Sequence, residues 1–203
     1  MNDDQQASNQ PPTFPLLLDS SPDWVDAVLN DFDSFLQDHA AAEKKASGMA
    51  LSMIAHYPDR TALVEAMSDL AIEELNHYRE VIRWLHKRGL QLASDSKDGY
   101  VIAMREHIRQ GRDAYFLDRL VSSAIIEARG CERFGLIAHA LPAGDPLQRF
   151  YESITRSEQR HYEEFIDLAL LYFDTDTVKA RELELLDAEA QILQTLPIRS
   201  ALH

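Results

Sequence analysis

Two short segments of the chain share an uncommon polar pattern whose side chains are typical metal ligands. Residues 73–81 read EELNHYREV and residues 157–165 read SEQRHYEEF, so both contain E-x-x-H-Y-x-E. A glutamate and a histidine three positions apart lie on one face of a helix, where a carboxylate and an imidazole can reach the same ion. The pattern therefore predicts two equivalent ligand pairs: Glu74 with His77, and Glu158 with His161.

Each pair interrupts an apolar stripe of helical spacing. Apolar residues recur three or four positions apart on both sides of each pair, as on the buried face of a helix. The nearest are Leu70 and Val81 around the first pair, and Ile154 and Phe165 around the second. The ligand pairs are therefore expected in the core. The other polar residues of the pattern lie off the stripe, at the surface or around the site: Tyr78, Glu80, Tyr162 and Glu164.

Two further glutamates lie on the apolar faces of their own predicted helices. Glu43 precedes Glu74 by 31 positions, and Glu127 precedes Glu158 by the same 31. The chain therefore reads as two copies of a helix pair, with one glutamate on the first helix and E-x-x-H on the second. This repetition suggests an internal duplication.

Four carboxylates that converge in a core need positive charge, because each buried unpaired charge costs several kcal/mol. Two divalent cations balance four carboxylates. One glutamate from each of two helices and E-x-x-H from each of two others is the known ligand set of di-iron and di-manganese carboxylate bundles. Mixed oxygen and nitrogen ligation suits either metal. The predicted roles are one nitrogen ligand per metal for His77 and His161, bridging for Glu74 and Glu158, and terminal for Glu43 and Glu127.

Other polar residues near the predicted ligands have simpler explanations. His39, one turn before Glu43, is placed either beside the site or in ordinary packing or surface positions. Glu73 lies about 100° around the helix from Glu74 and is expected to be solvated. Three residues are expected to act by packing alone: Tyr78, Cys131 and Tyr162.

Composition indicates one globular domain with an acidic surface. The 203 residues are 45% hydrophobic and 27% charged, and the net charge of −14 argues against binding nucleic acid or anionic membranes through bulk charge. The single cysteine cannot form an internal disulfide, which favours a reducing cytoplasm. The start of the chain lacks a basic secretory signal, and no apolar run has transmembrane length. We predict a cytoplasmic protein with a mobile polar leader over residues 1–21 and a single domain over residues 22–203.

The predicted fold is all-α, a ferritin-like four-helix bundle with additional shorter helices. Glycine and proline are scarce, at 7 and 8 residues, and no strand pattern is sustained. The loop LPAGDP and the turn at Pro58-Asp59 separate long helical segments. The predicted helices cover about 22–57 (with a break near Asn30–Asp31), 60–88, 100–110, 113–140, 146–173 and 178–196.

Local sequence around the ligands is more specific than the bundle pattern. The blocks DHAAAEKKAS, EELNHY, EARGCERF and SEQRHY occur in this order and resemble the tRNA hydroxylases that act on 2-methylthio-N6-isopentenyladenosine. The resemblance covers about residues 20–175. D-H-A-x-x-E-K-K-A and E-A-R-x-C-E-R-F are its most specific parts. The family's metal ligands map without departure onto these residues: Glu43, Glu74, His77, Glu127, Glu158 and His161.

The resemblance implies an O2-dependent di-iron monooxygenase that hydroxylates the isopentenyl group of the modified adenosine beside the tRNA anticodon. It implies two iron ions, O2 and an external electron donor as cofactors, and tRNA and that donor as partners. The chain is expected to work without a membrane, as a monomer or small oligomer. The alternative is another ferritin-like di-iron protein for iron oxidation and storage or for peroxide reduction, although the chain has no C-x-x-C pair for a rubredoxin iron.

A tRNA substrate requires a local basic surface on this acidic chain. Residues 79–112 contain eight basic and four acidic residues, for a net charge of +4. This segment is either a phosphate-binding patch or an ordinary solvated helix end. Lys44 and Lys45 lie either at the mouth of the site or in solvent. The candidate tRNA contacts are Lys44, Lys45, Arg83, Lys87, Arg88, Arg105, Arg109 and Arg112.

Overall fold

The computed structural model describes residues 14–203, which contain seven helices and no strand. The all-α prediction is confirmed, and among these residues no helix is long and apolar enough to cross a membrane. In chain order the helices are α1 (Pro22–Asn30), α2 (Phe32–His56), α3 (Thr61–Lys87), α4 (Gly99–Glu106), α5 (Arg112–Ala140), α6 (Pro146–Tyr172) and α7 (Thr175–Thr195).

Helix ends follow the capping residues in the sequence. Ser21 caps α1, with Pro22 at its first position. The predicted break near Asn30–Asp31 is present, because Asp31 has φ −139° and ψ 61° and its side chain accepts a hydrogen bond from the Ser34 amide. The first predicted helix is therefore two helices, and the second of them carries Glu43.

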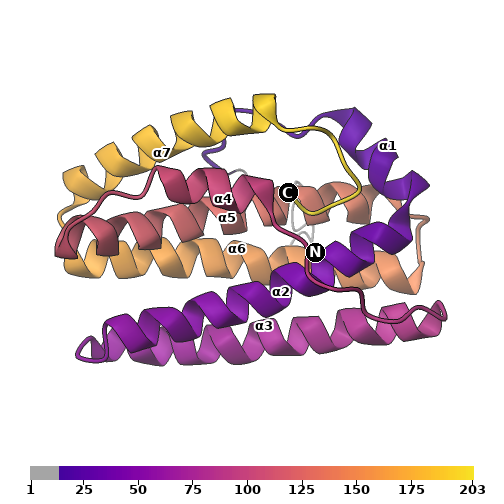
Figure 1. Cartoon of the computed structure of the whole chain (residues 1–203), viewed down its shortest axis with the longest axis horizontal. Coiled ribbons are helices and arrows are strands. Elements are labelled where there is room, and N and C mark those ends of the chain that lie inside the picture. The colour runs from indigo at the N-terminus through magenta and orange to yellow at the C-terminus, as the bar shows by residue number, and fades with distance from the viewer. Residues whose placement is uncertain (1–13) are drawn as a thin grey trace, which may run out of the picture.

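The bundle consists of two antiparallel helix pairs, α2 with α3 and α5 with α6, with α4 and α7 lying against the second pair (Figure 1). Buried apolar residues form two clusters along this bundle. One contains Met67 and Phe165, and the other contains Leu36 and Tyr151. The predicted ligands fall between the two clusters on all four long helices, so the polar site lies at mid-length in the core.

The predicted leader, residues 1–21, falls partly on residues 1–13, which lie outside the described residues. The described part contacts the bundle. The Leu18 carbonyl accepts a hydrogen bond of 2.7 Å from Arg129 Nη2, and Ser20 Oγ donates one of 2.7 Å to Glu132 Oε2. The domain boundary at residue 22 stays a prediction, but residues 18 and 20 are held by α5.

A buried ion pair joins α5 to α7. Arg129 and Glu189 are both fully buried, with Nε–Oε1 at 2.8 Å, and Tyr100 donates a hydrogen bond of 3.2 Å to the same carboxylate. Replacing Glu189 by alanine removes one of two carboxylates bonded to Arg129, with Glu132 Oε2 remaining at 3.0 Å from Nη1, so the free energy of unfolding is expected to fall by about 1–3 kcal/mol. Urea denaturation measures this. The exposed Asp187, on the same helix, is the control, and Asp187→Ala should change stability by less than about 0.5 kcal/mol. Equal losses in both variants would contradict a structural role for the pair.

Candidate metal centre

The four long helices bring the six predicted ligands together in the core. Helix α2 supplies Glu43, and α5 supplies Glu127. Helices α3 and α6 each supply a glutamate and a histidine one turn apart, as the repeated pattern predicts. The side chains form two overlapping groups whose ligand atoms lie within 4.8 Å of one another: Glu43, Glu74, His77 and Glu158, and Glu74, Glu127, Glu158 and His161.

His77 and His161 both direct Nδ1 of the imidazole ring toward the carboxylates. His161 Nδ1 lies 3.0 Å from Glu74 Oε1 and 3.6 Å from Glu158 Oε2. His77 Nδ1 lies 3.5 Å from Glu43 Oε2 and 3.9 Å from both Glu74 Oε2 and Glu158 Oε1. Glu74 and Glu158 thus belong to both groups, which is the placement that a bridging ligand needs.

Several buried atoms of this cluster have no hydrogen-bond partner within residues 14–203. They are Glu74 Oε1, His77 Nδ1, Glu158 Oε1, and both Nδ1 and Nε2 of His161. A buried polar atom without a partner costs about 1–3 kcal/mol, and more when the group is charged. Such atoms are rare in folded proteins, and here the oxygen atoms and the Nδ1 atoms face one another across the same small space. Cations bound between them would satisfy the oxygen atoms and Nδ1 atoms, so this donor set fits two metal ions.

The carboxylates shift one another's protonation strongly. Burial raises the pKa of Glu74 and of Glu127 well above the ordinary value, and neighbouring carboxylates raise both further. Burial also opposes the charged form of Glu158, but interaction with the neighbouring His161 outweighs it and lowers that pKa to about 2. Burial lowers the pKa of His77, but Glu43 outweighs it and raises the pKa to about 9. Four ionised carboxylates therefore need added positive charge, which two divalent cations provide.

His39 lies beside the site rather than in ordinary packing. Its Nε2 lies 2.6 Å from Glu43 Oε1, and its Nδ1 lies 3.2 Å from the Tyr151 hydroxyl. Burial lowers the pKa of His39 to about 3, so the ring is neutral and carries one N–H. Nε2–H therefore donates to the Glu43 carboxylate, and the Tyr151 hydroxyl donates to Nδ1.

The prediction that Glu73 is merely solvated is wrong. Its carboxylate accepts hydrogen bonds from Ser157 Oγ and from Arg160 Nη2, the latter at 2.6 Å. It also lies 3.4 Å from His161 Nε2 and 3.8 Å from His77 Nε2. His161 has the largest effect on Glu73 and, together with Ser157, lowers its pKa to about 2. Glu73 thus approaches both histidines from the side opposite the ligand cluster, a position typical of carboxylates that orient metal-binding imidazoles.

The other residues near the site are packing residues, as predicted. Cys131 is buried and its thiol donates to the Thr155 carbonyl at 3.0 Å, while burial raises its pKa. The Tyr162 hydroxyl donates to Glu182 at 3.0 Å. Tyr78 packs against one of the apolar clusters.

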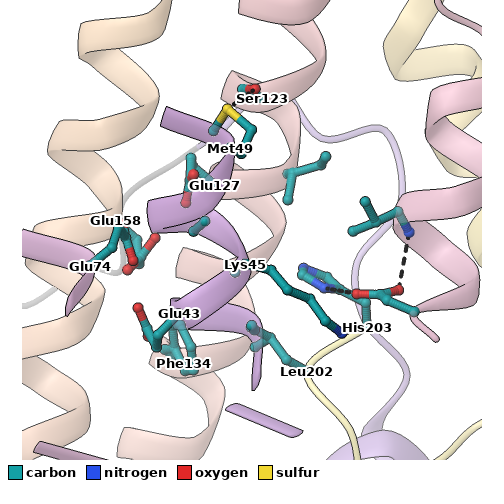
Figure 2. A pocket seen from close by; sticks show the side chains of 16 residues that line it. Glu43, Lys45, Met49, Glu74, Ser123, Glu127, Phe134, Glu158, Leu202 and His203 are labelled. Carbon is teal, nitrogen blue, oxygen red and sulfur yellow. Dashed lines mark hydrogen bonds and ion pairs between the residues drawn. The ribbon is translucent and has the colours of Figure 1, made fainter. Parts of the chain in front are cut away.

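A cavity of about 140 Å³ reaches the four glutamates from one side of the bundle (Figure 2). Small and apolar residues form most of the rest of its wall, including Ala46, Ile126 and Phe134. The exposed Lys45 and the largely buried side chain of His203 also line it, and His203 Nδ1 lies 3.1 Å from Asp98 Oδ2. This cavity could not be predicted from the sequence, because Asp98 and His203 are distant from the ligand segments in sequence and come to line it only when the chain folds.

The eight candidate tRNA contacts do not share one surface. Lys44 pairs with Asp95 at 2.8 Å, and Lys45 donates to the Ser96 carbonyl at 2.8 Å, so both fasten the segment before α4. Arg83, Lys87 and Arg88 lie near the end of α3, at one end of the bundle (Figure 1). Arg109 and Arg112 lie at the start of α5, at the opposite end (Figure 1). Residues 79–112 are therefore not a single basic patch.

Comparison with known proteins adds independent findings. A family model described as tRNA-(MS2IO6A)-hydroxylase (MiaE) matches residues 10–203. Two proteins with the name tRNA 2-(methylsulfanyl)-N(6)-isopentenyladenosine(37) hydroxylase are similar to the chain. The one from Pseudomonas putida is 38% identical over 84% of this chain and 86% of that protein. The one from Salmonella typhimurium is 31% identical over 77% of this chain, which spans 56% of that longer protein.

A solved structure shares the fold. It is that of "Protein 43 with aldehyde deformylating oxygenase activity from Synechococcus". Its TM-score is 0.85 at 32% sequence identity, covering 91% of this chain and 92% of that one. The ferritin-like bundle predicted from the sequence is thus the fold of a protein with oxygenase activity.

Proposed function

The chain belongs to the MiaE family of tRNA hydroxylases, and on that premise we propose that it hydroxylates the isopentenyl group of 2-methylthio-N6-isopentenyladenosine in tRNA. One observation carries the proposal: an apolar cavity ends at four buried glutamates whose donor set fits two metal ions. An apolar five-carbon group is a suitable occupant for a cavity of about 140 Å³.

We propose that the metal ions are iron, held by the six residues of the cluster. His77 and His161 would each serve one ion, Glu74 and Glu158 both ions, and Glu43 and Glu127 one each. When bound, the iron pair supplies the chemistry that reduces O2, with two electrons from an external donor and two protons, so that one oxygen atom enters the substrate and the other leaves as water.

The chain's own residues position the substrate and keep water out. The walls at Ala46, Ile126 and Phe134 offer the isopentenyl group apolar contact and leave little room for solvent. Confinement of the reacting group beside the carboxylates is the protein's contribution to rate, because a fixed geometry removes the entropy cost of encounter. We propose that Lys45, which is exposed at the cavity, meets a phosphate of the anticodon loop once its bond to the Ser96 carbonyl opens.

Nucleoside mass spectrometry tests the reaction directly. Isopentenylated tRNA is incubated with iron-loaded protein, O2 and a reductant, then digested to nucleosides. The expected product is the modified adenosine with one added oxygen atom. His77→Ala should give no product, because one iron position loses its nitrogen ligand. Absence of product from wild-type protein that holds two iron ions per chain would overturn the proposed substrate but leave the metal centre standing.

A second candidate is deformylation of an aldehyde, the activity ascribed to the Synechococcus protein. The apolar cavity is the observation that favours it, since an alkyl chain is also a suitable occupant. The same iron-loaded protein, given an aliphatic aldehyde and analysed for the hydrocarbon one carbon shorter, separates this activity from tRNA hydroxylation.

A further inference from the structure

The two halves of the ligand cluster differ in what holds their terminal glutamates. Glu127 follows Glu43 by 84 positions, and the two E-x-x-H pairs are separated by the same 84. By this offset the counterpart of His39 is Ser123. One half therefore has an imidazole one turn before its terminal glutamate, and the other half has a short hydroxyl.

His39 fixes Glu43 in one orientation. The 2.6 Å hydrogen bond from Nε2 engages Oε1, which leaves Oε2 on the side of His77 Nδ1, 3.5 Å away. The imidazole itself is fully buried, and its ring centroid lies 4.6 Å from that of Phe134. The Tyr151 hydroxyl holds the second ring nitrogen. The ligand oxygen of Glu43 is thus oriented before any ion arrives.

Glu127 is not held in this way. Ser123 Oγ lies 3.7 Å from Met49 Sδ, and Figure 2 shows Ser123, Met49 and Glu127 together on the cavity wall. The side chain that acts most strongly on the buried Glu127 carboxyl is Glu158, which is itself one of the ligands. The orientation of Glu127 therefore depends on the other ligands and on the ions that they hold.

We propose that His39 is a positioning residue that makes the Glu43–His77 half the tighter metal position, while the Glu127–His161 half binds its ion more weakly and adjusts when reactants enter the cavity. This inference rests on the metal centre proposed above, not on the tRNA substrate. Residues that hold a metal ligand contribute about 10- to 100-fold to metal affinity. Glu73 lies closer to His161 Nε2 than to His77 Nε2, at 3.4 and 3.8 Å, so it supports the histidine of the second half but does not hold that half's terminal glutamate.

Titration of the metal-free full-length chain with Co²⁺, followed by visible absorption and calorimetry, tests the proposal. Wild-type protein should bind two ions in two stages. His39→Ala should raise the Kd of the tighter stage by about 10- to 100-fold and merge the stages. His39→Gln keeps an N–H donor on the same turn and should recover most of the affinity. Ser123→Ala is the matched control from the other half and should change neither Kd by more than about twofold.

Two results would overturn the proposal while leaving the two-metal centre intact. They are two equal affinities in wild-type protein, and equal responses of His39→Ala and Ser123→Ala. A wild-type chain that binds no Co²⁺ would overturn both the proposal and the metal centre. Circular dichroism reports the helix content of each variant. If His39→Ala unfolds, Tyr151→Phe, which removes the donor to Nδ1, takes its place with a smaller rise in the Kd of the tighter stage.

Discussion

Replacing Glu158 by alanine is expected to abolish metal binding and hydroxylase activity together. Glu158 belongs to both ligand groups, so its loss takes an oxygen ligand from each ion at once. Its ionised form is favoured despite burial, because His161 lowers its pKa to about 2. Metal affinity should fall by more than the roughly 100-fold seen when only a supporting residue is lost. Iron content by mass spectrometry and the nucleoside assay measure the two losses.

The stability of the same variant is also expected to fall. Burial and neighbouring carboxylates oppose the ionised forms of Glu74 and Glu127, but His161 favours the ionised form of Glu158. Removing Glu158 takes this favourable partner from His161, so the free energy of unfolding of the metal-free protein is expected to decrease. Glu152, exposed on the same helix, is the matched control, and Glu152→Ala should keep metal and activity. Full iron content in Glu158→Ala would contradict the bridging assignment.

The metal ligands could be predicted because their positions follow from the periodicity of single helices. A helix fixes which residues share a face, so the repeated E-x-x-H and the equal spacing to Glu43 and Glu127 were enough to infer convergence of four helices. The structure brings these residues together between two apolar clusters, as the interrupted stripes indicate.

The residues around the ligands were not predictable from spacing. The bond from Tyr151 to His39 joins α6 to α2, and the contact of Glu73 with Ser157 joins α3 to α6. Such contacts depend on how each helix is rotated and shifted against its neighbour. The hydrophobic periodicity of one helix carries no information about that relative orientation. One feature of the sequence could have pointed to Glu73: it lies one helical turn before His77, close enough for its carboxylate to contact that imidazole.

The basic segment shows a second limit of sequence reasoning. Residues 79–112 carry a net positive charge as a stretch of sequence, but α3 ends at one end of the bundle and α5 begins at the other (Figure 1). Arg109 also pairs with the buried Asp118 at 2.7 Å, so its charge is already balanced within the protein. Charge that is contiguous in sequence is therefore not contiguous on the surface.

Filling the cavity should separate substrate binding from metal binding. Ala46 lines the cavity on α2, and a phenylalanine there would place its ring in the space of about 140 Å³ that leads to the glutamates. Ala46→Phe is therefore expected to lower kcat/KM for isopentenylated tRNA by about 100-fold, the loss typical of a displaced reacting group. Metal content should not change, because residue 46 contributes no ligand.

Leu51→Phe provides the matched control on the same helix. Leu51 is 53% exposed, so the larger ring there enters solvent rather than the cavity. Activity and iron content should both match wild type. If Ala46→Phe loses activity with full iron content, the substrate reaches the metal through this cavity. If it keeps full activity, the isopentenyl group must approach the four glutamates from another side, and the assignment of the cavity would be wrong even with the metal ligands correct.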